Sequence, residues 1–447
     1  MFTPHTDADR EEMLRVIGVH KLDDLFADVP AAHRFPLLDL PPAFTEMEAL
    51  MQMEELAGAN ETAHDLACFL GAGAYYHYTP AVVDAIIRRG EFLTAYTPYQ
   101  PEVSQGTLQA IFEYQSLIAN LTGMDVSNAS HYDGATATAE AAVMAYSHFR
   151  GKRTRFILSP SLNPQYRDVV KTYMSGYEHE LLGCDSEPLG KPNDLTALLN
   201  DNTALLVVQY PDFFGRIFDF TALIEKAHEV GALVAVAVNP IALGVLKTPG
   251  AMGADIVVGE GQPLGIPLSY GGPYLGIFAT KKEYVRKIAG RLVGESIDGK
   301  GRRGYVLTLT AREQHIRREK ATSNICTNQG LMALAATVYM SFVGKSGLRQ
   351  VANLCYQKAH YAAAQIGKVP GYEVKTPAPY FHEFIVKCPK SVEDTNLHLL
   401  DHGILGGYDL GKDYPALNGH MLIAVTEMVS KDDIDALCEV LAEVNHD

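Results

Sequence analysis

Cysteine is scarce in this sequence, and the spacing of the few cysteines excludes two classes of site. The 447 residues contain six cysteines, at positions 68, 184, 326, 355, 388 and 438, with no CxxC pair and no HExxH motif. Scattered cysteines are typical of reduced thiols in a cytoplasmic compartment, and they predict neither a disulfide framework nor a zinc site. The acidic N-terminal stretch has no apolar core, so we expect no export signal.

The sequence also lacks a basic surplus and a long apolar run. Lysine and arginine total 37 against 53 aspartates and glutamates, which gives a formal net charge of -16. Such an acidic chain is a poor match for a nucleic acid, whose phosphates require a broad basic field. The most apolar run, residues 232–238, has the length of a strand and is too short to span a membrane. We therefore expect neither a nucleic-acid partner nor a membrane.

The length of the chain predicts a large core and at least one further domain. Residues 1–65 show helical periodicity at 12–17 and 46–56, separated by a proline-marked stretch, and predict an N-terminal helical arm. Residues 66–325 predict a large α/β domain. Residues 326–447, which begin with two long helical segments, predict a small C-terminal α+β domain.

Short apolar runs alternate with helical segments through the predicted large domain. The expected strands are residues 155–159, 204–210, 232–238, 255–258 and 275–279. The expected helices are residues 82–89, 104–121, 135–149, 164–174 and 220–230. Such alternation predicts βαβ units and a mostly parallel sheet covered on both faces. With the arm and the small domain, the layout resembles the aspartate-aminotransferase-like, fold type I enzymes that depend on pyridoxal phosphate, whose sheet is of a seven-stranded type.

Two stretches are rich in glycine, proline and tyrosine. Residues 69–80 contain a Gly-x-Gly motif, which is a weak signal for a nucleotide loop because no clear strand precedes it. In residues 94–106, two prolines fix the backbone around Tyr99 and present its side chain on a rigid loop. Tyr96 and Tyr99 are either core or interface aromatics or residues that reach a ligand.

Residues 312–320 form a basic cluster in an otherwise acidic protein. They read Arg-Glu-Gln-His-Ile-Arg-Arg-Glu-Lys and run into Thr322, Ser323 and Asn324. Cations beside short hydroxyl and amide side chains suit a phosphate or a carboxylate. A solvated helix face in which Glu313 pairs with Arg317 explains the same residues. The charges alone leave both interpretations open.

These motifs closely resemble the N-terminal half of the glycine cleavage system P-protein, glycine dehydrogenase (decarboxylating). In many prokaryotes, the family member that corresponds to this half is a separate polypeptide, called subunit 1 or alpha. The tyrosine-rich stretch and the block from residue 312 to residue 324 are both long and specific, and the similarity extends from Pro4 into the C-terminal domain.

The sequence lacks the lysine that this kind of fold uses to hold its cofactor. Pyridoxal phosphate is held as a lysine Schiff base, usually with an acid facing its pyridinium nitrogen. The lysine should follow the strand at 255–258, but no lysine lies between Lys247 and Lys281, and Gln262 stands near the equivalent position. The strand that should supply the acid runs into Asn239 instead. We therefore predict no catalytic residue in this chain.

The resemblance implies that a second chain completes the enzyme. Glycine dehydrogenase subunit 2 (beta) would hold pyridoxal 5'-phosphate covalently, in an alpha2beta2 heterotetramer, and this chain would be inactive alone. The family reaction decarboxylates glycine and transfers its aminomethyl group to the lipoyl arm of H-protein, and T-protein and L-protein belong to the wider system.

The same resemblance implies roles for loops that act across the subunit interface. The residues expected to contact the partner's cofactor are Thr322, Ser323, Asn324, Tyr96 and Tyr99. The residues expected to supply a positive field for phosphate or carboxylate are Arg312, His315 and Arg318. Two alternatives remain: a paralogue that only stabilises its partner, and an autonomous decarboxylase that uses an unexpected lysine such as Lys281.

Overall fold

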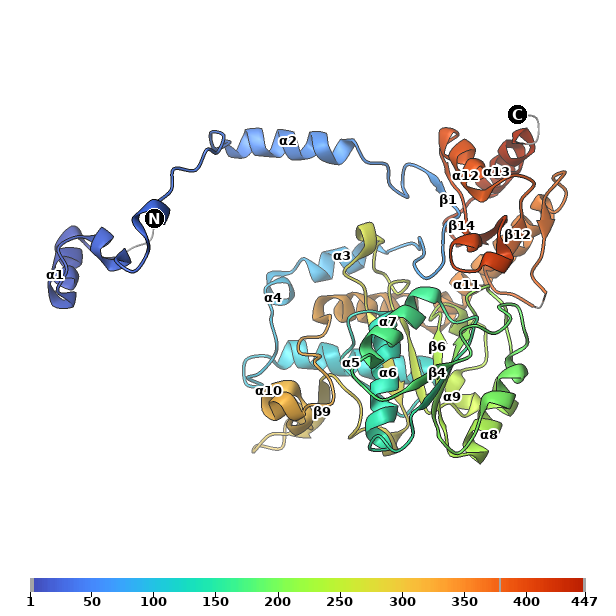
Figure 1. Ribbon diagram of the computed structural model, residues 1–447, viewed down its shortest axis with the longest axis horizontal. Coiled ribbons are helices and arrows are strands. Elements are labelled where there is room, and N and C mark those ends of the chain that lie inside the picture. Colours follow the sequence, from blue (N-terminus) through green and yellow to red (C-terminus); the bar gives the residue numbers. More distant parts are fainter. Residues whose placement is uncertain (1–3, 378, 445–447) are drawn as a thin grey trace. The chain divides into compact units, whose positions relative to one another are not determined.

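The chain divides into two units, Met1–Glu61 and Thr62–Asp447, in a computed structural model that describes residues 4–377 and 379–444 (Figure 1). The elements of the first unit are α1 (Asp7–Ile17), η1 (Leu22–Phe26), η2 (Ala31–His33) and α2 (Glu46–Gly58). Thr6 and Thr45 begin the two α-helices with reciprocal capping boxes, which satisfy free backbone N–H groups at each start. No residue between 4 and 61 is buried, so local capping is the main support of these helices.

A seven-stranded sheet lies at the centre of the second unit, in the order β2-β8-β7-β6-β5-β3-β4. Its strands are β2 (Val126–Ser127), β3 (Arg155–Leu158), β4 (Glu180–Leu182), β5 (Thr203–Tyr210), β6 (Leu233–Val238), β7 (Ile256–Glu260) and β8 (Gly276–Thr280). Neighbours from β4 to β7 run parallel, and β8 is antiparallel to both β7 and β2. The predicted fold class, with a mostly parallel seven-stranded sheet, is confirmed.

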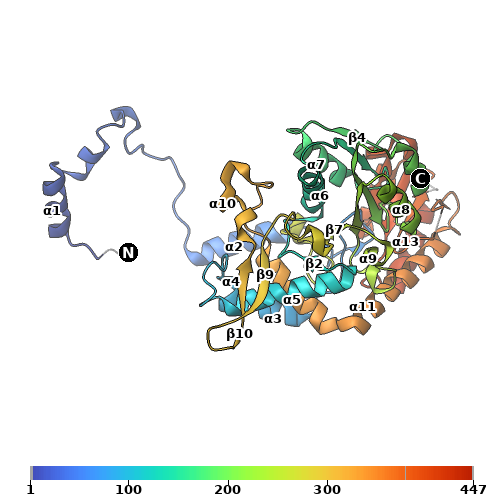
Figure 2. The ribbon, with the colours of Figure 1, turned by 90° about the horizontal axis from the view of Figure 1, so that it is seen from below.

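Helices cover both faces of this sheet, as the views in Figures 1 and 2 show. The α-helices of the second unit are α3 (Ala81–Ile87), α4 (Gly90–Leu93), α5 (Gln105–Thr122), α6 (Gly134–His148), α7 (Pro164–Met174), α8 (Thr221–Glu229), α9 (Pro249–Met252), α10 (Gln314–Arg317), α11 (Gly330–Ile366), α12 (Val392–Asp401) and α13 (Lys431–Glu443). Helices α6 and α7 pack on one face, and α5, α8 and α11 pack on the other.

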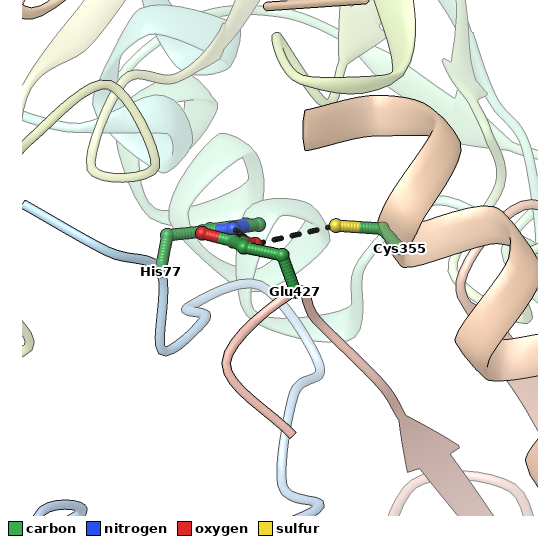
Figure 3. Close-up of side chains that lie close together, drawn as sticks. All are labelled: His77, Cys355 and Glu427. Carbon is green, nitrogen blue, oxygen red and sulfur yellow. Dashed lines mark hydrogen bonds and ion pairs between the residues drawn. The ribbon is translucent and has the colours of Figure 1, made fainter. Parts of the chain in front are cut away.

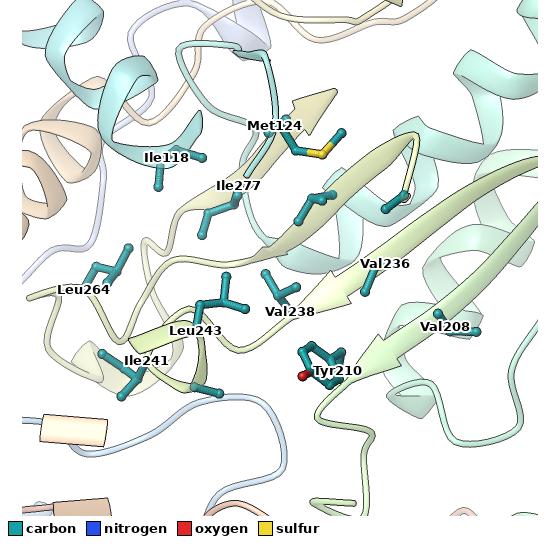
Figure 4. Close-up of a cluster of buried hydrophobic side chains, with 14 of the residues drawn as sticks. Ile118, Met124, Val208, Tyr210, Val236, Val238, Ile241, Leu243, Leu264 and Ile277 are labelled. Atoms are coloured by element: carbon teal, nitrogen blue, oxygen red, sulfur yellow. The ribbon is translucent and has the colours of Figure 1, made fainter. Parts of the chain in front are cut away.

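Alternation along the strands divides the core between the two faces. On β5, Leu206 and Val208 join the cluster with α5 and α11, whereas Leu205 and Val207 join the cluster with α6 and α7. Figure 4 shows the first cluster, in which Val236 and neighbouring apolar side chains fill the space between sheet and helices. Each such side chain, fully removed from water, contributes about 1.5–3 kcal/mol to folding.

By length and composition alone, helix α11 could cross a membrane. No other helix in the described ranges 4–377 and 379–444 meets the same criteria. Buried core helices pass the same test, and α11 contributes buried alanines to two hydrophobic clusters. A non-helical residue, Gly344 (φ 59°), interrupts it near the point where the sequence predicts two separate helices. Its length is therefore explained by packing against two parts of the same unit.

A β-hairpin that the sequence analysis missed precedes the basic segment. It consists of β9 (Leu292–Ile297) and β10 (Arg303–Thr308), with Asp298 accepting backbone hydrogen bonds in the turn. Two glutamines of α5 hold the hairpin, because Gln105 pairs with the backbone of Tyr305 and Gln115 with that of Val293. The hairpin thus fixes the chain just before the predicted anion site.

A second, four-stranded sheet lies in the C-terminal part, in the order β11-β12-β15-β14. The remaining strands of the chain are β1 (Ala67–Cys68), β11 (Glu373–Val374), β12 (Glu383–Lys387), β13 (Ile404–Leu405), β14 (Tyr408–Asp409) and β15 (His420–Ala424). Phe384 and Ile423 lie in a hydrophobic cluster of their own with α12 and α13. Strand β1 pairs with β13 in a separate two-stranded parallel sheet, which joins residues 67 and 68 to the C-terminal part of the chain. The boundary predicted at residue 326 stays a prediction.

Candidate functional site

The position expected for a cofactor lysine holds a buried glutamine with three hydrogen bonds. Gln262, which follows β7, is 1% exposed. Its Oε1 accepts the N–H of Tyr75 at 2.9 Å, and its Nε2 donates to the carbonyls of Tyr75 at 2.9 Å and Ile266 at 2.8 Å. All polar atoms of the side chain are therefore used to join the end of the sheet to the tyrosine-containing loop.

A carboxylate occupies the N-terminus of α6 beside this glutamine. Glu260 accepts the N–H of Gly134 at 2.9 Å, and also those of Gln262 at 2.9 Å and Leu275 at 3.0 Å. Burial raises the pKa of Glu260 to about 7, although its backbone donors oppose the shift. A helix N-terminus attracts an anion such as phosphate. Here a side chain of the same chain contacts that N-terminus.

The strand end expected to supply an acid carries an amide. Asn239 follows β6, and its Nδ2 donates to Nε2 of His382 at 2.8 Å while its Oδ1 accepts the N–H of Ile241 at 3.0 Å. His382 is buried, and burial together with the nearby His77 lowers its pKa to about 3. The imidazole is neutral at physiological pH and accepts from the amide. This position therefore has no carboxylate that could face the pyridinium nitrogen of a bound cofactor.

These residues are a poor fit for covalently held pyridoxal phosphate. The cavity at the ends of β6 and β7, lined among others by Tyr75, Asn239 and Glu260, has a volume of about 20 Å³. That is room for about one water molecule. The donor set offers no primary amine, and the adjacent helix N-terminus already has a carboxylate.

The segment predicted to bind phosphate lines a larger, open cavity. Thr322, Ser323 and Asn324 border a space of about 490 Å³, together with Glu140 of α6 and Tyr173 of α7. The structure therefore brings the three predicted residues to one concave surface. Two helices that cover the main sheet form its other wall.

Within this segment, the Ser323 hydroxyl is already engaged. It donates to the carboxyl group of Glu140 at 2.5 Å and accepts the N–H of Ile325 at 3.0 Å. Burial raises the pKa of Glu140 to about 7, and the hydroxyl hydrogen bond opposes this shift. In the part of the chain that the structure describes, the side chains of Thr322 and Asn324 have no hydrogen-bond partner. These two side chains, unlike Ser323, have donors available for a ligand.

Arg312 is held by backbone carbonyls, and it also lines a second, smaller cavity of about 100 Å³ beside Thr322 and Ser323. Its guanidinium donates to the backbone carbonyl of Ile288 and, at 2.6 Å, to that of Gly290. Burial lowers the pKa of Arg312. The predicted field-forming cation is thus used to hold the segment against the chain before β9.

The neighbouring charges form a second internal contact. Glu313 is 3.7 Å from Arg291 and 3.7 Å from His315, so it pairs with these residues and not with Arg317, the partner expected for a solvated helix face. Arg318 lies at the open cavity beside Thr322, where its charge faces the candidate ligand space. Of the three predicted cations, Arg318 is the one placed beside the cavity.

The two predicted tyrosines contact the same segment from the 94–106 loop. The Tyr96 hydroxyl lies 3.2 Å from the hydroxyl of Thr327 and its side chain is 74% exposed. The Tyr99 hydroxyl accepts from Arg291 at 3.3 Å, and its ring lies 6.0 Å from that of His315. Residues far apart in the sequence thus form one surface, although neither tyrosine lines the 490 Å³ cavity.

The Gly-x-Gly stretch connects the second unit's sheets and does not form a nucleotide loop. A Cβ at Gly71 would clash with Ala424 and the Glu383 side chain, which explains the glycine by close packing. His77 Nδ1 and the Tyr78 N–H lie 2.7 and 2.8 Å from the carboxylate of Glu427. Figure 3 shows this contact with Cys355 of α11, whose thiol also points to Glu427.

Sequence reasoning missed Glu140, Glu260 and Arg291 as contributors to these surfaces. Glu260 could have been noticed, because a carboxylate at the end of a buried strand requires compensating donors. No such sign is present in the sequence for Glu140 or Arg291. Glu140 contacts Ser323, which lies more than a hundred positions away, and Arg291 contacts Glu313, about twenty positions away.

Comparisons with known proteins show which family and which fold the chain shares. The family model of the glycine cleavage system P-protein matches residues 1–441. The chain is 55% identical, over 99% of both chains, to a protein of Thermomicrobium roseum named as glycine dehydrogenase (decarboxylating) subunit 1. It is similar to a crystal structure of glycine decarboxylase (P-protein) in inhibitor-bound form, with TM-score 0.91, 44% identity, and coverage of 99% of this chain and 100% of that one. A sphingosine-1-phosphate lyase of Burkholderia pseudomallei, 15% identical with TM-score 0.66 and 94% coverage of each chain, shares the fold.

Proposed function

This chain belongs to the glycine cleavage system P-protein family, as a member of its subunit 1 (alpha) type, and we propose that it completes the active site of a lysine-bearing subunit 2. Gln262 carries this proposal. Its amide stands near the expected lysine position and is saturated by Tyr75 and Ile266. We expect the chain itself to hold no pyridoxal phosphate and to contribute to catalysis through loops at its surface.

The reaction proposed for the two-subunit enzyme is decarboxylation of glycine, with transfer of the aminomethyl group to the lipoyl arm of H-protein. Pyridoxal phosphate on subunit 2 supplies the electron sink. The residues of this chain bind and orient: they meet negative charge with fixed donors that require no rearrangement during the reaction. The cavity beside Thr322 is where such a negative group would be met.

Thr322 and Asn324 are the donors that we assign to the partner's phosphate. Their side chains border the open cavity and have no partner among the described residues. Arg318 adds positive charge at the same wall, and charge-assisted hydrogen bonds to phosphate are the stronger class. Ser323 has a positioning role, because its hydroxyl connects the segment to Glu140.

Tyr96, Tyr99 and His315 form the adjoining part of the proposed subunit interface. The exposed Tyr96 ring is available to the partner chain, and Tyr99 is oriented by Arg291. Arg312 stabilises this surface by donating hydrogen bonds to the backbone carbonyls of Ile288 and Gly290.

The first unit supports the proposal of a partner chain. Its helix α2 exposes large apolar side chains, among them Met47, Leu50 and Met51, and such a surface in a soluble protein marks an interaction site. We propose an alpha2beta2 heterotetramer with subunit 2 that engages lipoyl-bearing H-protein, in a system that includes T-protein and L-protein. The six free cysteines of the chain support a cytoplasmic location.

One reduction experiment tests the assignment of the cofactor. The chain is purified alone and with subunit 2, incubated with pyridoxal phosphate, and reduced with borohydride before peptide mapping. We expect the reduced adduct on a lysine of subunit 2 alone, and decarboxylation in the complex alone. A specific adduct on this chain, for example at Lys281, would contradict the proposal. Full activity of subunit 2 without this chain would instead favour a purely stabilising paralogue.

A further inference from the structure

Two histidines and a glutamate gather where α12 approaches the end of α13. His398 lies on α12, His402 is the C-cap residue of the same helix four positions later, and Glu443 is the last residue of α13. The Nε2 atoms of the two histidines lie 3.8 and 3.6 Å from the same carboxylate oxygen, Oε2 of Glu443. All three ligand atoms lie within 4.8 Å of one another.

These separations are somewhat longer than those between ligands of one metal ion. Zinc binds imidazole nitrogen and carboxylate oxygen at about 2.0–2.2 Å, so tetrahedral ligand atoms stand about 3.3 Å apart. The two nitrogen–oxygen distances exceed that value by a few tenths of an ångström, and the two histidine nitrogens lie within 4.8 Å of each other, so side-chain rotations would have to bring the three ligand atoms closer together. Histidine pairs at i and i+4 place both imidazoles on one helix face. The cluster is therefore close to a three-ligand arrangement before any ion binds.

The orientation of the histidines favours coordination. Nδ1 of His402 contacts the carbonyl of His398 at 2.9 Å, which assigns its proton to Nδ1 and leaves the Nε2 lone pair toward Glu443. Metal-binding histidines are commonly oriented by such a backbone contact of the other ring nitrogen. Nε2 of His398 is buried and has no hydrogen-bond partner in the ranges that the structure describes. An unpaired buried nitrogen costs free energy, and a bound ion would remove that cost.

A second cluster, formed by His77, Cys355 and Glu427, shows the contrasting geometry (Figure 3). Its nitrogen–oxygen distance of 2.7 Å is that of a hydrogen bond and is too short for two ligands of one ion. Burial and the nearby Glu427 raise the pKa of the Cys355 thiol well above its usual value, which disfavours the thiolate that metals bind. This cluster is a hydrogen-bonded contact between segments.

We propose that His398, His402 and Glu443 form a binding site for a divalent transition-metal ion such as Zn²⁺, with solvent completing the coordination. Imidazole and carboxylate ligands suit Zn²⁺, Co²⁺ and Ni²⁺. The ion joins the end of α12 to the C-terminal end of α13, where Glu443 faces the Nε2 atoms of the two histidines at 3.8 and 3.6 Å. The site is independent of the proposed active-site role.

The test uses the full-length chain without an affinity tag, stripped with a chelator and titrated with Zn²⁺ or Co²⁺. We expect one ion per chain by calorimetry, the visible absorbance of tetrahedral cobalt, and a higher melting temperature with Zn²⁺. Each of His398→Ala, His402→Ala and Glu443→Gln is expected to weaken binding by at least about tenfold. Circular dichroism of each variant shows that the fold is retained.

Matched controls are Glu393→Gln on α12 and His33→Ala in the first unit, which are expected to bind as the parent does. The titrations are repeated on a His446→Ala background, so that a histidine outside the described residues does not account for the signal. The inference is overturned if the parent chain shows no stoichiometric ion. It is equally overturned if the triple variant of His398, His402 and Glu443 binds as tightly as the parent.

Discussion

Gln262→Ala tests whether the end of β7 is closed by an internal amide. The substitution removes three buried hydrogen bonds, two to Tyr75 and one to Ile266, with lengths of 2.8–2.9 Å. A buried hydrogen bond contributes about 1 kcal/mol, and a buried group left without a partner costs more. The missing side-chain volume adds a cavity term. We expect the free energy of unfolding to fall by about 3–4 kcal/mol.

Urea denaturation followed by circular dichroism measures this change. Gln357→Ala is the matched control, because Gln357 is exposed on α11 and its loss is expected to alter stability by less than about 0.5 kcal/mol. If Gln262→Ala also lost less than about 1 kcal/mol, the amide would not be holding the Tyr75 loop, and the reasoning would be refuted.

A second variant at the same position tests whether the site is unable to hold the cofactor because its space is filled, or only because it has no lysine amine. Gln262→Lys supplies the missing group, but Glu260 still contacts the N-terminus of α6 and the cavity measures about 20 Å³. We therefore expect no borohydride-stable cofactor adduct on the Gln262→Lys chain. A stoichiometric adduct at residue 262 would show that the site had lost only its lysine.

Three further predictions concern the proposed interface and its support. Thr322→Ala is expected to weaken the affinity of the two-subunit enzyme for its cofactor by about tenfold, because loss of one phosphate hydrogen bond costs about 1.4 kcal/mol. Equilibrium dialysis measures this affinity, and an unchanged value would show that Thr322 does not contact the phosphate. Arg312→Met is expected to lower the melting temperature, because it leaves the carbonyls that Arg312 contacts unpaired, and a variant as stable as the parent would argue against this role. Burial would raise the pKa of Glu427, but the facing His77 and the Tyr78 N–H outweigh it and lower this pKa from 4.5 to about 2. The stabilisation is therefore complete above pH 4.5 and lost toward pH 2, so the stability difference between the parent and Glu427→Gln should shrink on acidification; a constant difference in urea denaturation series would contradict this.

The local patterns of the sequence specified most of the main sheet. The alternating apolar runs predicted β3, β5, β6, β7 and β8, because a buried parallel strand is apolar on both faces whatever packs against it. The hairpin of β9 and β10 was missed although Asp298 and Gly299 form a turn signal between its strands. Its first strand, β9, has polar and exposed residues in its second half, so it does not form a continuous apolar run.

Side-chain partners could not be predicted in the same way. Arg312 and Arg318 are six residues apart and chemically alike, yet one contacts backbone carbonyls and the other lines the open cavity. Ser323 and Thr322 are adjacent hydroxyls, yet Ser323 alone contacts Glu140. Neighbouring residues of the same type have different contacts because the partner of each side chain comes from a segment that is distant in the sequence.

The sequence by itself therefore determined that the chain has an α/β sheet fold, that its motifs match one family, and that no lysine lies between Lys247 and Lys281. These features depend on residue type and on spacing within one segment. Only the tertiary structure decided that Glu260 contacts the N-terminus of α6, that Gln262 closes the end of the sheet on Tyr75, and that His398 meets Glu443. Each of these contacts joins segments that packing brings together, and short-range periodicity carries no information about which segments will meet.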